Sequence, residues 1–516
     1  MAWADDLQRA LLTRGLSVAS IPCKGRGLVT TRDFSPGEVI IYQEPYAASP
    51  NKFGVGLSSC DGCFASNNLK KCSACRIAWY CGNMCQKSEW KLHQAECQAL
   101  ASLAEDKKKL LTPTLRLIVR LLLRRKLQDE QVIPTSATDN YNLVNVLESH
   151  INDIDEKQLV LFAQMANLVK LVLPLLEIDI REVTHNFSKL ACNAHTICDD
   201  ELRPLGTGLY PVISIINHSC MPNSVLMFEG RVAYVRALVP LPKDTEVLIS
   251  YIETAATTTR RQNDLKQYFF TCMCPRCMKV FKSFKLPSLN SLSILSLIFF
   301  LSFFYILLPH IKNSDEGLKE DAILEGYRCK DMKCNGYLLP DSEEKVFTCQ
   351  LCGFIRDGKE IKMVASEVTL LSENASSCLS SGKYSEASAL YKTIEQLQQK
   401  LYHPFSIYLL QTYETLLKIF MELKDWEEAL AYCRLTIPIY QRIYPAIHPM
   451  TGLQFYTCGK LEWLLERTED ALRSFTKATD ILQITHGTRT PFMRELISKL
   501  EEVKAEISFK LSGGDY

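Results

Sequence analysis

The fold of this chain is decided by the stretch Gly208-Leu-Tyr-Pro-Val-Ile-Ser-Ile-Ile-Asn-His-Ser-Cys-Met-Pro-Asn223. Val212 to Ile216 holds four apolar residues and one serine, which predicts a buried strand or a short helix. Asn, His, Ser and Cys then follow without a break, and Pro222 comes soon after. A polar cluster at the end of a buried element is an expected place for a functional site. The alternative is a turn that happens to carry polar residues.

Composition and cysteine content limit the function classes. The chain has 516 residues, enough for roughly three domains, and 59 Lys and Arg nearly balance 58 Asp and Glu. This bulk charge does not predict a polyanion-binding protein. The N-terminus lacks the basic start and long apolar core of a signal peptide. The 21 cysteines are therefore expected to bind metal rather than to form disulfides. Six stand apart from the clusters and are expected to be small buried side chains: Cys23, Cys192, Cys198, Cys378, Cys433 and Cys458.

The densest cysteine cluster lies in residues 60–97 and places eight soft ligands within 38 residues. Zinc takes four ligands in a structural site, so the cluster predicts two closed sites with no open position for catalysis. Ser88 to Cys97 is expected to form a short helix with its last two ligands on one face. The eight candidate ligands are Cys60, Cys63, Cys72, Cys75, Cys81, Cys85, His93 and Cys97.

Short strands and packing helices are expected on both sides of this cluster. Gly25-Arg-Gly27 and Pro36-Gly37 indicate turns, and Val39 to Tyr42 is a β-rich run. Apolar residues at helical spacing predict helices in Leu100–Leu127 and Gln158–Leu176. The strand-like runs that follow are Ala191–Ile197, Pro211–Ile216, Ser224–Phe228, Val232–Val235 and Glu246–Tyr251.

A third zinc site is expected after these strands. Cys272-x-Cys274-x2-Cys277 provides only three of the four ligands that a structural zinc requires. Cys220 is the expected fourth ligand, because it lies in the only other suitable polar cluster. A zinc bound by these four cysteines would place the Cys272–Cys277 segment over the Asn217-His218 turn.

Several motifs together resemble known families. Asn217-His-Ser-Cys-x-Pro-Asn223, Glu246-Val-Leu-Ile-Ser-Tyr251 and the Cys272–Cys277 set resemble the SET and post-SET motifs of protein lysine methyltransferases. Residues 60–97 resemble a MYND zinc finger over their whole length. A MYND finger inserted after Gly25-Arg-Gly27 is the layout of the SET-and-MYND group, and the resemblance covers residues 10–280.

The resemblance implies metal pairing and a partner. MYND fingers interleave their ligands, which implies Cys60, Cys63, Cys81 and Cys85 on one zinc and Cys72, Cys75, His93 and Cys97 on the other. They usually bind proline-rich peptides, which requires exposed aromatic rings. Trp79 and Trp90 are the candidates, although core packing is the plainer interpretation for each.

The resemblance also implies transfer of a methyl group from S-adenosylmethionine to a lysine amine. Tyr251 matches the catalytic tyrosine, Tyr268 matches an aromatic residue of the lysine channel, and Phe270 one near the adenine. The implied cofactor contacts are Lys24, Gly25, Arg26, Gly27, His150, Asn193, Asn217, His218, Tyr251 and Phe270. Some family members carry Asn where His150 and Arg26 stand.

Residues 281–315 depart from the family pattern. Leu286–Pro309 contains no charged residue in 24 positions, which is long enough for a membrane-spanning helix. Lys279, Lys282 and Lys285 precede it and would keep the SET block in the cytosol. A span here would separate the SET block from the domain that packs against it in the family. We therefore favour a poorly packed insertion or a translated intron over a membrane segment.

The following segment predicts a fourth zinc site of ribbon type. Cys329-x4-Cys334-x14-Cys349-x2-Cys352 provides four thiolates in two pairs, a spacing typical of structural zinc.

The C-terminal part predicts helical repeats. Ala387, Ala429 and Ala471 recur at intervals of 42 residues in similar sequence, and His-Pro pairs recur at His403 and His448. A repeat of this length, with a small residue where two helices cross, is typical of a tetratricopeptide-like array. A generic helical bundle is the alternative.

The expected fold is a multi-domain α+β protein, with a β-rich SET fold that carries an inserted MYND zinc finger and a helical insert. A post-SET zinc site and a C-terminal α-helical tetratricopeptide-like domain complete it. The expected segments are 10–58 (SET, N-terminal part), 60–97 (MYND finger), 98–190 (helical insert), 191–251 (SET core), 260–280 (post-SET zinc), 281–315 (apolar insertion), 325–356 (zinc-ribbon-like) and 362–510 (tetratricopeptide-like).

The expected function is S-adenosylmethionine-dependent methylation of protein lysines, in histones or in other proteins. The alternative is a zinc-finger and helical-repeat scaffold with a weak or inactive SET domain. A monomer in the nucleus or the cytoplasm is expected, with three zinc ions or four, and without direct sequence-specific contact to nucleic acid.

Overall fold

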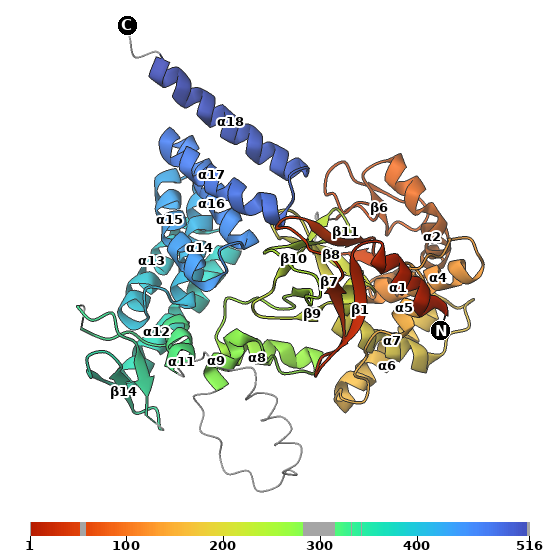
Figure 1. Cartoon of the computed structure of the whole chain (residues 1–516), viewed down its shortest axis with the longest axis horizontal. Coiled ribbons are helices and arrows are strands. Elements are labelled where there is room, and N and C mark those ends of the chain that lie inside the picture. Colours follow the sequence, from red (N-terminus) through yellow and green to blue (C-terminus); the bar gives the residue numbers. More distant parts are fainter. Residues whose placement is uncertain (1, 52–57, 282–314, 332, 342, 513–516) are drawn as a thin grey trace. The chain divides into compact units, whose positions relative to one another are not determined.

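The computed structural model describes residues 2–51, 58–281, 315–331, 333–341 and 343–512, and Figure 1 shows their helices and strands. The chain forms two compact units. The first contains Met1–Tyr251, Leu265–Phe270 and Thr479–Ser498, and the second contains Ile252–Asp264, Thr271–Ala478 and Lys499–Tyr516. The predicted apolar segment Leu286–Pro309 lies outside the described residues. None of the described helices is long and apolar enough to cross a membrane.

Small β-sheets form one half of the first unit, the part that is expected to be the catalytic SET fold. One is a hairpin of β1 and β2, and two have three antiparallel strands in the orders β10-β11-β3 and β4-β8-β7. A short parallel pair joins β9 to β12. The strands are β1 (Leu16–Ile21), β2 (Gly25–Thr30), β3 (Val39–Gln43), β4 (Ala47–Pro50), β7 (Ala194–Cys198), β8 (Pro204–Leu209), β9 (Asn217–His218), β10 (Ser224–Glu229), β11 (Val232–Ala237) and β12 (Leu248–Ile249). Their inward residues form one core that includes Leu28, Ile41, Tyr210 and Val235.

Helix α4 organises the rest of the first unit. It buries nine consecutive residues, Leu115–Leu123, because it contacts α2, α6 and α7 as well as strands β4 and β8. The buried run includes Arg116 and Arg120, so charged as well as apolar sides of this helix are covered. Thr112 caps its N-terminus by accepting a hydrogen bond from Leu115 N, and Pro113 begins its first turn. The helices of this part are α1 (Ala2–Leu12), α2 (Asn83–Ala101), α3 (Glu105–Lys108), α4 (Pro113–Asp129), α5 (Tyr141–Asn145), α6 (Glu156–Val172) and α7 (Ile180–Asn193).

The structure corrects three element predictions. Helix α7 continues through Asn193, so only the second half of the expected strand Ala191–Ile197 is a strand. Pro211–Ile216 contains the 3-10 turn η1 (Ile213–Ile215), the short helix that was the other option for this run. Ser214 explains the turn, because both its amide and its hydroxyl donate to Tyr210 O. The expected helix Leu100–Leu127 is broken between α2 and α4.

Only two of the six isolated cysteines are fully buried. Cys433 and Cys458 match the prediction, whereas Cys23 is exposed and the remaining three are half-buried. Cys23 occupies the turn of the β1–β2 hairpin with φ 60°, which explains its exposure.

The second unit is mostly helical. Each helix from α12 to α16 packs against the next, and Ala387, Ala429 and Ala471 are completely buried. These small side chains allow close approach of neighbouring helices, so the tetratricopeptide-like prediction is confirmed. The remaining helices are α8 (Thr258–Leu265), α9 (Pro275–Phe281), α11 (Asp315–Leu324), α12 (Gly358–Ser380), α13 (Tyr384–Leu401), α14 (Ile407–Glu422), α15 (Trp426–Ile443), α16 (Pro449–Leu464), α17 (Thr468–Thr485) and α18 (Pro491–Ser512). The end of α17 and the beginning of α18, within Thr479–Ser498, belong to the first unit, as does Leu265.

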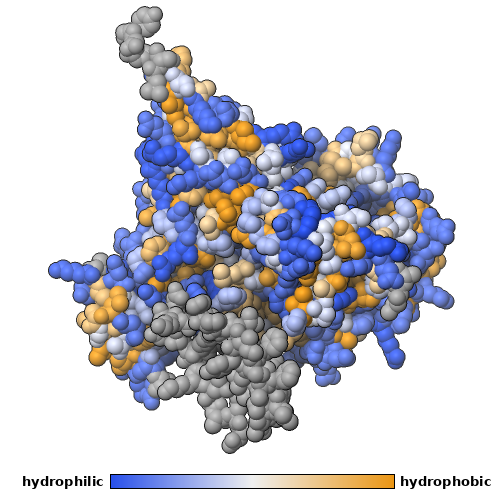
Figure 2. All heavy atoms as spheres, viewed as in Figure 1, coloured by the Kyte–Doolittle hydropathy of each residue, from blue (hydrophilic) through white to orange (hydrophobic). Residues whose placement is uncertain are grey.

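A three-stranded ribbon lies between α11 and α12 in the chain and is formed by β13 (Leu338–Pro340), β14 (Val346–Cys349) and β15 (Ile355–Asp357). Figure 2 shows hydrophobic side chains gathered at this end of the second unit, at the lower left of the view. Leu351 is 67% exposed and Ile355 is 64% exposed. The buried side chains Leu338 and Phe347 share a core with Ile361 of α12 and Leu401 of α13, so the ribbon has little core of its own.

Candidate active site and zinc centres

The β1–β2 turn and β9 meet at a shared carboxylate. Glu246 accepts a hydrogen bond from Asn217 Nδ2 at 2.9 Å and forms an ion pair with Lys24 Nζ at 2.6 Å. Asn217 Nδ2 also donates to Arg26 O at 3.0 Å. Gly27 permits this approach, because a Cβ there would lie 3.0 Å from Asn217 Nδ2. Lys24, Gly25, Arg26, Gly27 and Asn217 are thus gathered in one place.

Arg26 connects this turn to the segment before α6. Its guanidinium donates to Val146 O at 2.6 Å, and it lies 3.9 Å from a carboxylate oxygen of Glu148. Asn193 holds the same segment, because its Nδ2 donates to Glu148 O at 2.8 Å and to Lys189 O at 2.7 Å. Both amide hydrogens of Asn193 are therefore used within the protein, which leaves its Oδ1 for a ligand.

His150 lies at the end of this segment in the left-handed region, with φ 49°. Its ring stacks on Phe269, with centroids 4.9 Å apart, and Nδ1 lies 3.2 Å from Asp153 Oδ2. The aromatic partner of His150 is therefore Phe269, a residue that was not among the predicted site residues.

The parallel pair β9 and β12 brings His218 to Tyr251. Tyr251 N donates to His218 Nδ1 at 3.0 Å, and the two rings are 5.3 Å apart. His218 is buried, and its Nε2 lies 3.3 Å from Cys220 Sγ. His218 thus links the tyrosine to a candidate zinc ligand.

The Tyr251 hydroxyl has a defined orientation. It donates to Ile216 O at 2.5 Å, so its hydrogen is directed at the backbone and its lone pairs remain for a reacting group. Burial raises the pKa of Tyr251 above its ordinary value, with smaller contributions from Tyr268 and Glu246. The phenol is consequently neutral at any ordinary assay pH.

Aromatic rings enclose this hydroxyl. Tyr268 lies 5.0 Å and Phe270 6.3 Å from the Tyr251 ring, measured between centroids. Phe270 is also 5.8 Å from His218, and Tyr268 Oη donates to Tyr251 O at 3.4 Å. The structure thus brings His218, Tyr251, Tyr268 and Phe270 together as one aromatic cluster.

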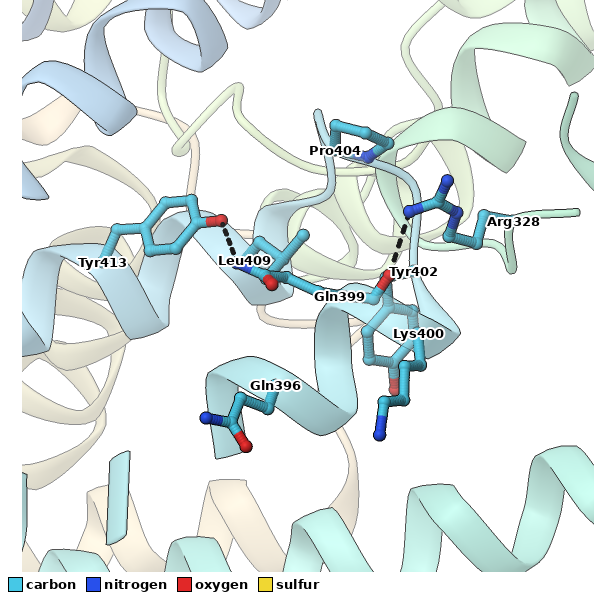
Figure 3. Close-up of a pocket in the computed structure, with 8 residues that line it drawn as sticks. All are labelled: Arg328, Gln396, Gln399, Lys400, Tyr402, Pro404, Leu409 and Tyr413. Carbon is cyan, nitrogen blue, oxygen red and sulfur yellow. Dashed lines mark hydrogen bonds between the residues drawn. The ribbon is translucent and has the colours of Figure 1, made fainter. Parts of the chain in front are cut away.

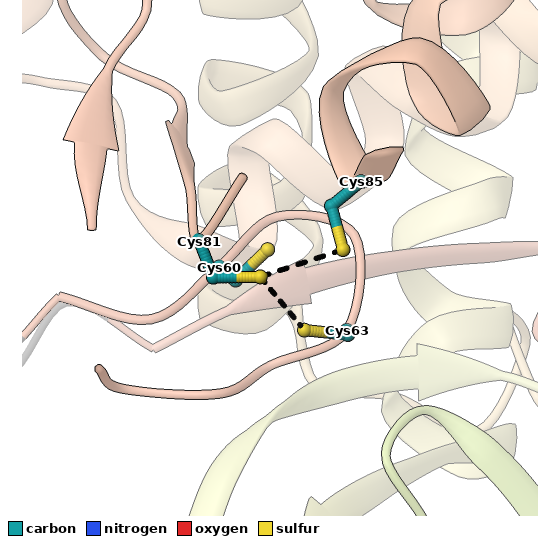
Figure 4. Close-up of side chains that lie close together, drawn as sticks. All are labelled: Cys60, Cys63, Cys81 and Cys85. Carbon is teal, nitrogen blue, oxygen red and sulfur yellow. Dashed lines mark hydrogen bonds between the residues drawn. The ribbon is translucent and has the colours of Figure 1, made fainter. Parts of the chain in front are cut away.

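The cysteine-rich segment folds into two separate sets of four ligands. One contains Cys60, Cys63, Cys81 and Cys85, and the other contains Cys72, Cys75, His93 and Cys97. Within the first set, drawn in Figure 4, Cys81 Sγ lies 3.6 Å from Cys63 Sγ and 3.5 Å from Cys85 Sγ. Tetrahedral zinc with bonds of about 2.3 Å separates its sulfurs by about 3.8 Å, so these distances suit zinc. The interleaved pairing is the one that the MYND resemblance implied.

Two further groups of four cysteines are present. Cys220, Cys272, Cys274 and Cys277 have sulfur atoms within 4.8 Å of one another, as do Cys329, Cys334, Cys349 and Cys352. In the ribbon group, Cys329 and Cys352 are 3.5 Å apart and Cys334 and Cys349 are 3.7 Å apart. All sixteen predicted ligands therefore gather in fours that fit zinc.

A buried charge network supports the two finger sites. Glu96 accepts from His93 Nδ1 at 3.1 Å, from Arg116 Nε at 2.7 Å and from Arg120 Nε at 3.0 Å. Asp61, beside ligand Cys60, is bound by the same two arginines. Burial alone would raise the pKa of Glu96, but Arg116 and Arg120 lower it well below its usual range. Arg120 also donates to Ala48 O at 2.8 Å, which connects the finger to strand β4.

Sequence reasoning missed the acidic residues of both sites. Asp61 and Glu96 each lie next to a zinc ligand in the sequence, and metal-bound histidines usually donate to a carboxylate, so this signal was available. Glu246 begins the Glu246–Tyr251 motif, but its contact with Lys24 joins residues 222 positions apart. That contact follows only from the fold.

Comparisons with known proteins agree with this geometry. Residues 25–252 match the SET domain family. The chain is 54% identical over 506 residues to Histone-lysine N-methyltransferase ASHR1 of Arabidopsis thaliana, covering 98% of each protein. The chain belongs to the SET-and-MYND protein lysine methyltransferases. It is also 28% identical to N-lysine methyltransferase SMYD2-A of Xenopus laevis, over 94% of this chain and 99% of the relative. SMYD2 of Gallus gallus is likewise 28% identical, over 95% of this chain and 98% of the relative.

Membership in the SET-and-MYND family defines the cofactors. The methyl donor is S-adenosylmethionine, and the cysteine groups are of the kind that binds zinc. Three features suit a ligand with an adenine, an amino acid part and an electrophilic methyl group. They are the tight turn at Gly27, the Asn193 side chain, whose Oδ1 is left for a ligand, and the aromatic cluster at Tyr251. The scaffold alternative is not favoured, because the relatives are named methyltransferases.

Proposed function

We propose that this enzyme methylates lysine side chains of histones, with Tyr251 and Tyr268 at the reacting amine and the β1–β2 turn at the cofactor. The anchored Tyr251 hydroxyl carries this proposal. S-adenosylmethionine supplies a methyl group already activated on a sulfonium, so the protein needs mainly to position a neutral amine in line with it.

The aromatic cluster prepares the amine. A protonated lysine loses its favourable hydration among the rings of Tyr251, Tyr268 and Phe270, which lowers the amine pKa and favours the neutral nucleophile. Because Tyr251 Oη donates to Ile216 O, its lone pairs can accept from the amine N–H. Burial also raises the pKa of Tyr268, so both phenols stay neutral while the amine is deprotonated.

The cofactor contacts are proposed for Lys24, Gly25, Arg26, Gly27, His150, Asn193, Asn217, His218, Tyr251 and Phe270. Support comes from the hydrogen bonds that join the β1–β2 turn, the segment before His150 and β9 into one region. Asn193 would contribute its Oδ1 only, and His150 would act together with Phe269.

Histone lysines are the first substrate class to test, because the relative with 54% identity is named a histone-lysine N-methyltransferase. We extend the proposal to a monomer acting in the nucleus or the cytoplasm. The finger is proposed to bind a proline-rich peptide through Trp90, which is 43% exposed, whereas Trp79 is half-buried.

The decisive experiment combines cofactor binding with turnover. Wild-type protein and Tyr251→Phe are titrated with S-adenosylmethionine by calorimetry, then assayed on core histones with a methyl-labelled cofactor. Both proteins should bind the cofactor with similar affinity. Tyr251→Phe should lose roughly 10²-fold or more in kcat, in line with the loss of one preorganised polar contact.

Wild-type protein that binds no cofactor would contradict the enzyme assignment. Cofactor binding with labelling of other lysate proteins, but not of histones, would contradict the substrate assignment alone. Mass spectrometry of the labelled products then identifies the lysine and the degree of methylation.

A further inference from the structure

A cavity of about 500 Å³ lies in the second unit, where the ribbon meets the helical repeats (Figure 3). Arg328, from the segment that leads into the ribbon, forms one side of it. Gln396, Gln399 and Lys400 at the end of α13 form another, and Tyr402 and Tyr413 add aromatic walls. Cavities of this size hold small molecules or a few residues of a peptide.

The charged side chains that line this cavity are both positive. Its lining includes two cations and no Asp or Glu. Among the residues that the structure describes, neither Arg328 nor Lys400 forms an ion pair with a carboxylate. The carboxylate of Glu395 is not part of the lining; it accepts from Gln399 Nε2 at 2.8 Å and from Tyr432 Oη at 2.8 Å and keeps its negative charge.

Two further arginines add to this positive field. Arg356 is buried and donates to Lys400 O at 3.3 Å, and Glu360, 3.6 Å from its guanidinium, offsets part of its charge. Arg442 lies over the Phe405 ring, 5.0 Å from its centroid. Burial, together with Arg442 and Arg328, lowers the pKa of His403 to about 4, which is consistent with excess positive charge beside the cavity.

The end of helix α13 does not cancel this field. A helix C-terminus presents carbonyl oxygens, which repel anions. Here three of them already accept hydrogen bonds: Gln399 O from Arg328 Nη1 at 3.1 Å, Lys400 O from Arg356, and Leu401 O from Arg328 N at 3.0 Å. The Arg328 guanidinium has five N–H donors, and within the described structure only Nη1 donates a hydrogen bond.

We propose that this cavity binds an acidic peptide segment of a protein partner, with carboxylates at Arg328 and Lys400 and an apolar or aromatic residue between Tyr402 and Tyr413. Carboxylates pair well with an arginine that has free donors. The side-chain amide of Gln396 can bond the peptide backbone, and Gln399 can accept a backbone N–H at its Oε1, because its Nε2 already donates to Glu395 and Tyr413. Since Arg328 directly precedes the buried ligand Cys329, the site requires a folded ribbon.

Binding can be measured by fluorescence anisotropy on the full chain with a defined probe set. The probes are labelled hexapeptides with two or more Asp or Glu and one Phe, Tyr or Leu, and a matched set with Asn and Gln in place of the acids. The acidic set should bind the wild type and weaken as salt rises. In Arg328→Gln/Lys400→Gln the dissociation constant should rise roughly tenfold or more, and in Lys400→Gln alone about threefold.

Lys418→Gln is the matched control, since Lys418 is an exposed lysine of α14 outside the cavity. It should bind like the wild type. Cys349→Ser should lose binding although it keeps both cations, because Arg328 loses its position. Cofactor affinity should be unchanged in Lys400→Gln and in Arg328→Gln/Lys400→Gln, which separates this proposal from the proposed catalytic function.

Three results would overturn the assignment. The first is that no acidic probe binds the wild type. The second is that the double variant binds the acidic probes as tightly as the wild type. The third is that only phosphorylated peptides and inorganic phosphate bind. The last result would mean a phosphate site instead of a carboxylate site.

Discussion

Gly27 occupies a position where a side chain would collide with the catalytic half of the first unit. A Cβ would lie 2.7 Å from Ile21 Cγ1 and 3.0 Å from Asn217 Nδ2. Real Cβ atoms almost never approach another heavy atom to less than about 3.0 Å, so part of the turn would have to move. Lys24 and Glu246 would move with it, because both bond to this turn or to Asn217.

We therefore expect Gly27→Ala to weaken S-adenosylmethionine binding by roughly tenfold, the equivalent of about 1.4 kcal/mol of overpacking. Calorimetric titration measures it. Gly82→Ala is the control, because no atom lies within 4 Å of a Cβ at that position. Equal affinity in Gly27→Ala and wild type would mean that this turn does not hold the cofactor.

His486 is a buried histidine in the first unit that is neutral when the protein is folded. Burial, with a smaller effect of Arg236, lowers its pKa to about 4, although its Nε2 donates to Asp200 O at 2.9 Å. The unfolded chain binds a proton near pH 6.5, so the stability from this group is present above that pH. It is lost as the pH falls from about 6.5 toward 4.

The thermal unfolding midpoint should fall between pH 7 and pH 5, with this histidine contributing about 2 kcal/mol. In His486→Phe the fall should be smaller, because the ionisable group is gone. Differential scanning calorimetry at several pH values checks this. An unchanged pH dependence in the variant would show that other groups are responsible.

At the scale of elements, helix α4 joins the MYND finger to the sheet of the catalytic half. Arg116 and Arg120 project from α4 to Glu96 and Asp61 in the finger, and Arg120 reaches Ala48 O in β4. All four charged side chains are at most 4% exposed. A buried network of this kind stabilises only when complete, because removing one charge leaves its partners unpaired in a dry interior.

We expect Glu96→Gln to destabilise the first unit by about 3 kcal/mol and to speed zinc release from the finger. A metallochromic indicator follows the release, and circular dichroism follows unfolding. Glu105→Gln is the matched control, because Glu105 pairs with Lys108 at the surface and should matter little. Similar zinc release from both variants would refute a role for the buried network.

At the scale of the whole molecule, four cysteine-rich groups are distributed over the finger, the post-SET segment and the ribbon. Each holds four ligand atoms within 4.8 Å of one another. Such small or irregular segments bury too little apolar surface to fold alone, so metal binding and folding are coupled.

Elemental analysis of the purified chain should give four zinc ions per molecule, and Cys352→Ser should give three. Cys352 is the suitable position because it is exposed, so its loss disturbs packing least. Removing all zinc with a strong chelator should abolish cofactor binding as well as activity. A wild-type value of two would mean that the groups outside the finger are not metal sites.

The sequence by itself determined the local chemistry of this protein. The finger and ribbon ligands, the Asn217-His218 pair and Tyr251 could be predicted because a metal or a short motif recruits residues that lie close along the chain. The repeats could be predicted because each buries a small residue at a fixed interval, as Ala387 and Ala429 do.

Only the tertiary structure decided which charges meet. Lys24 and Glu246 are 222 positions apart, and Asp61 and Arg120 are 59 apart. No periodicity encodes such pairs, because they arise when separate elements pack and their charged side chains must be neutralised on burial. The same reason applies to the cavity at Arg328, whose positive field exists only where the ribbon and the end of α13 lie together.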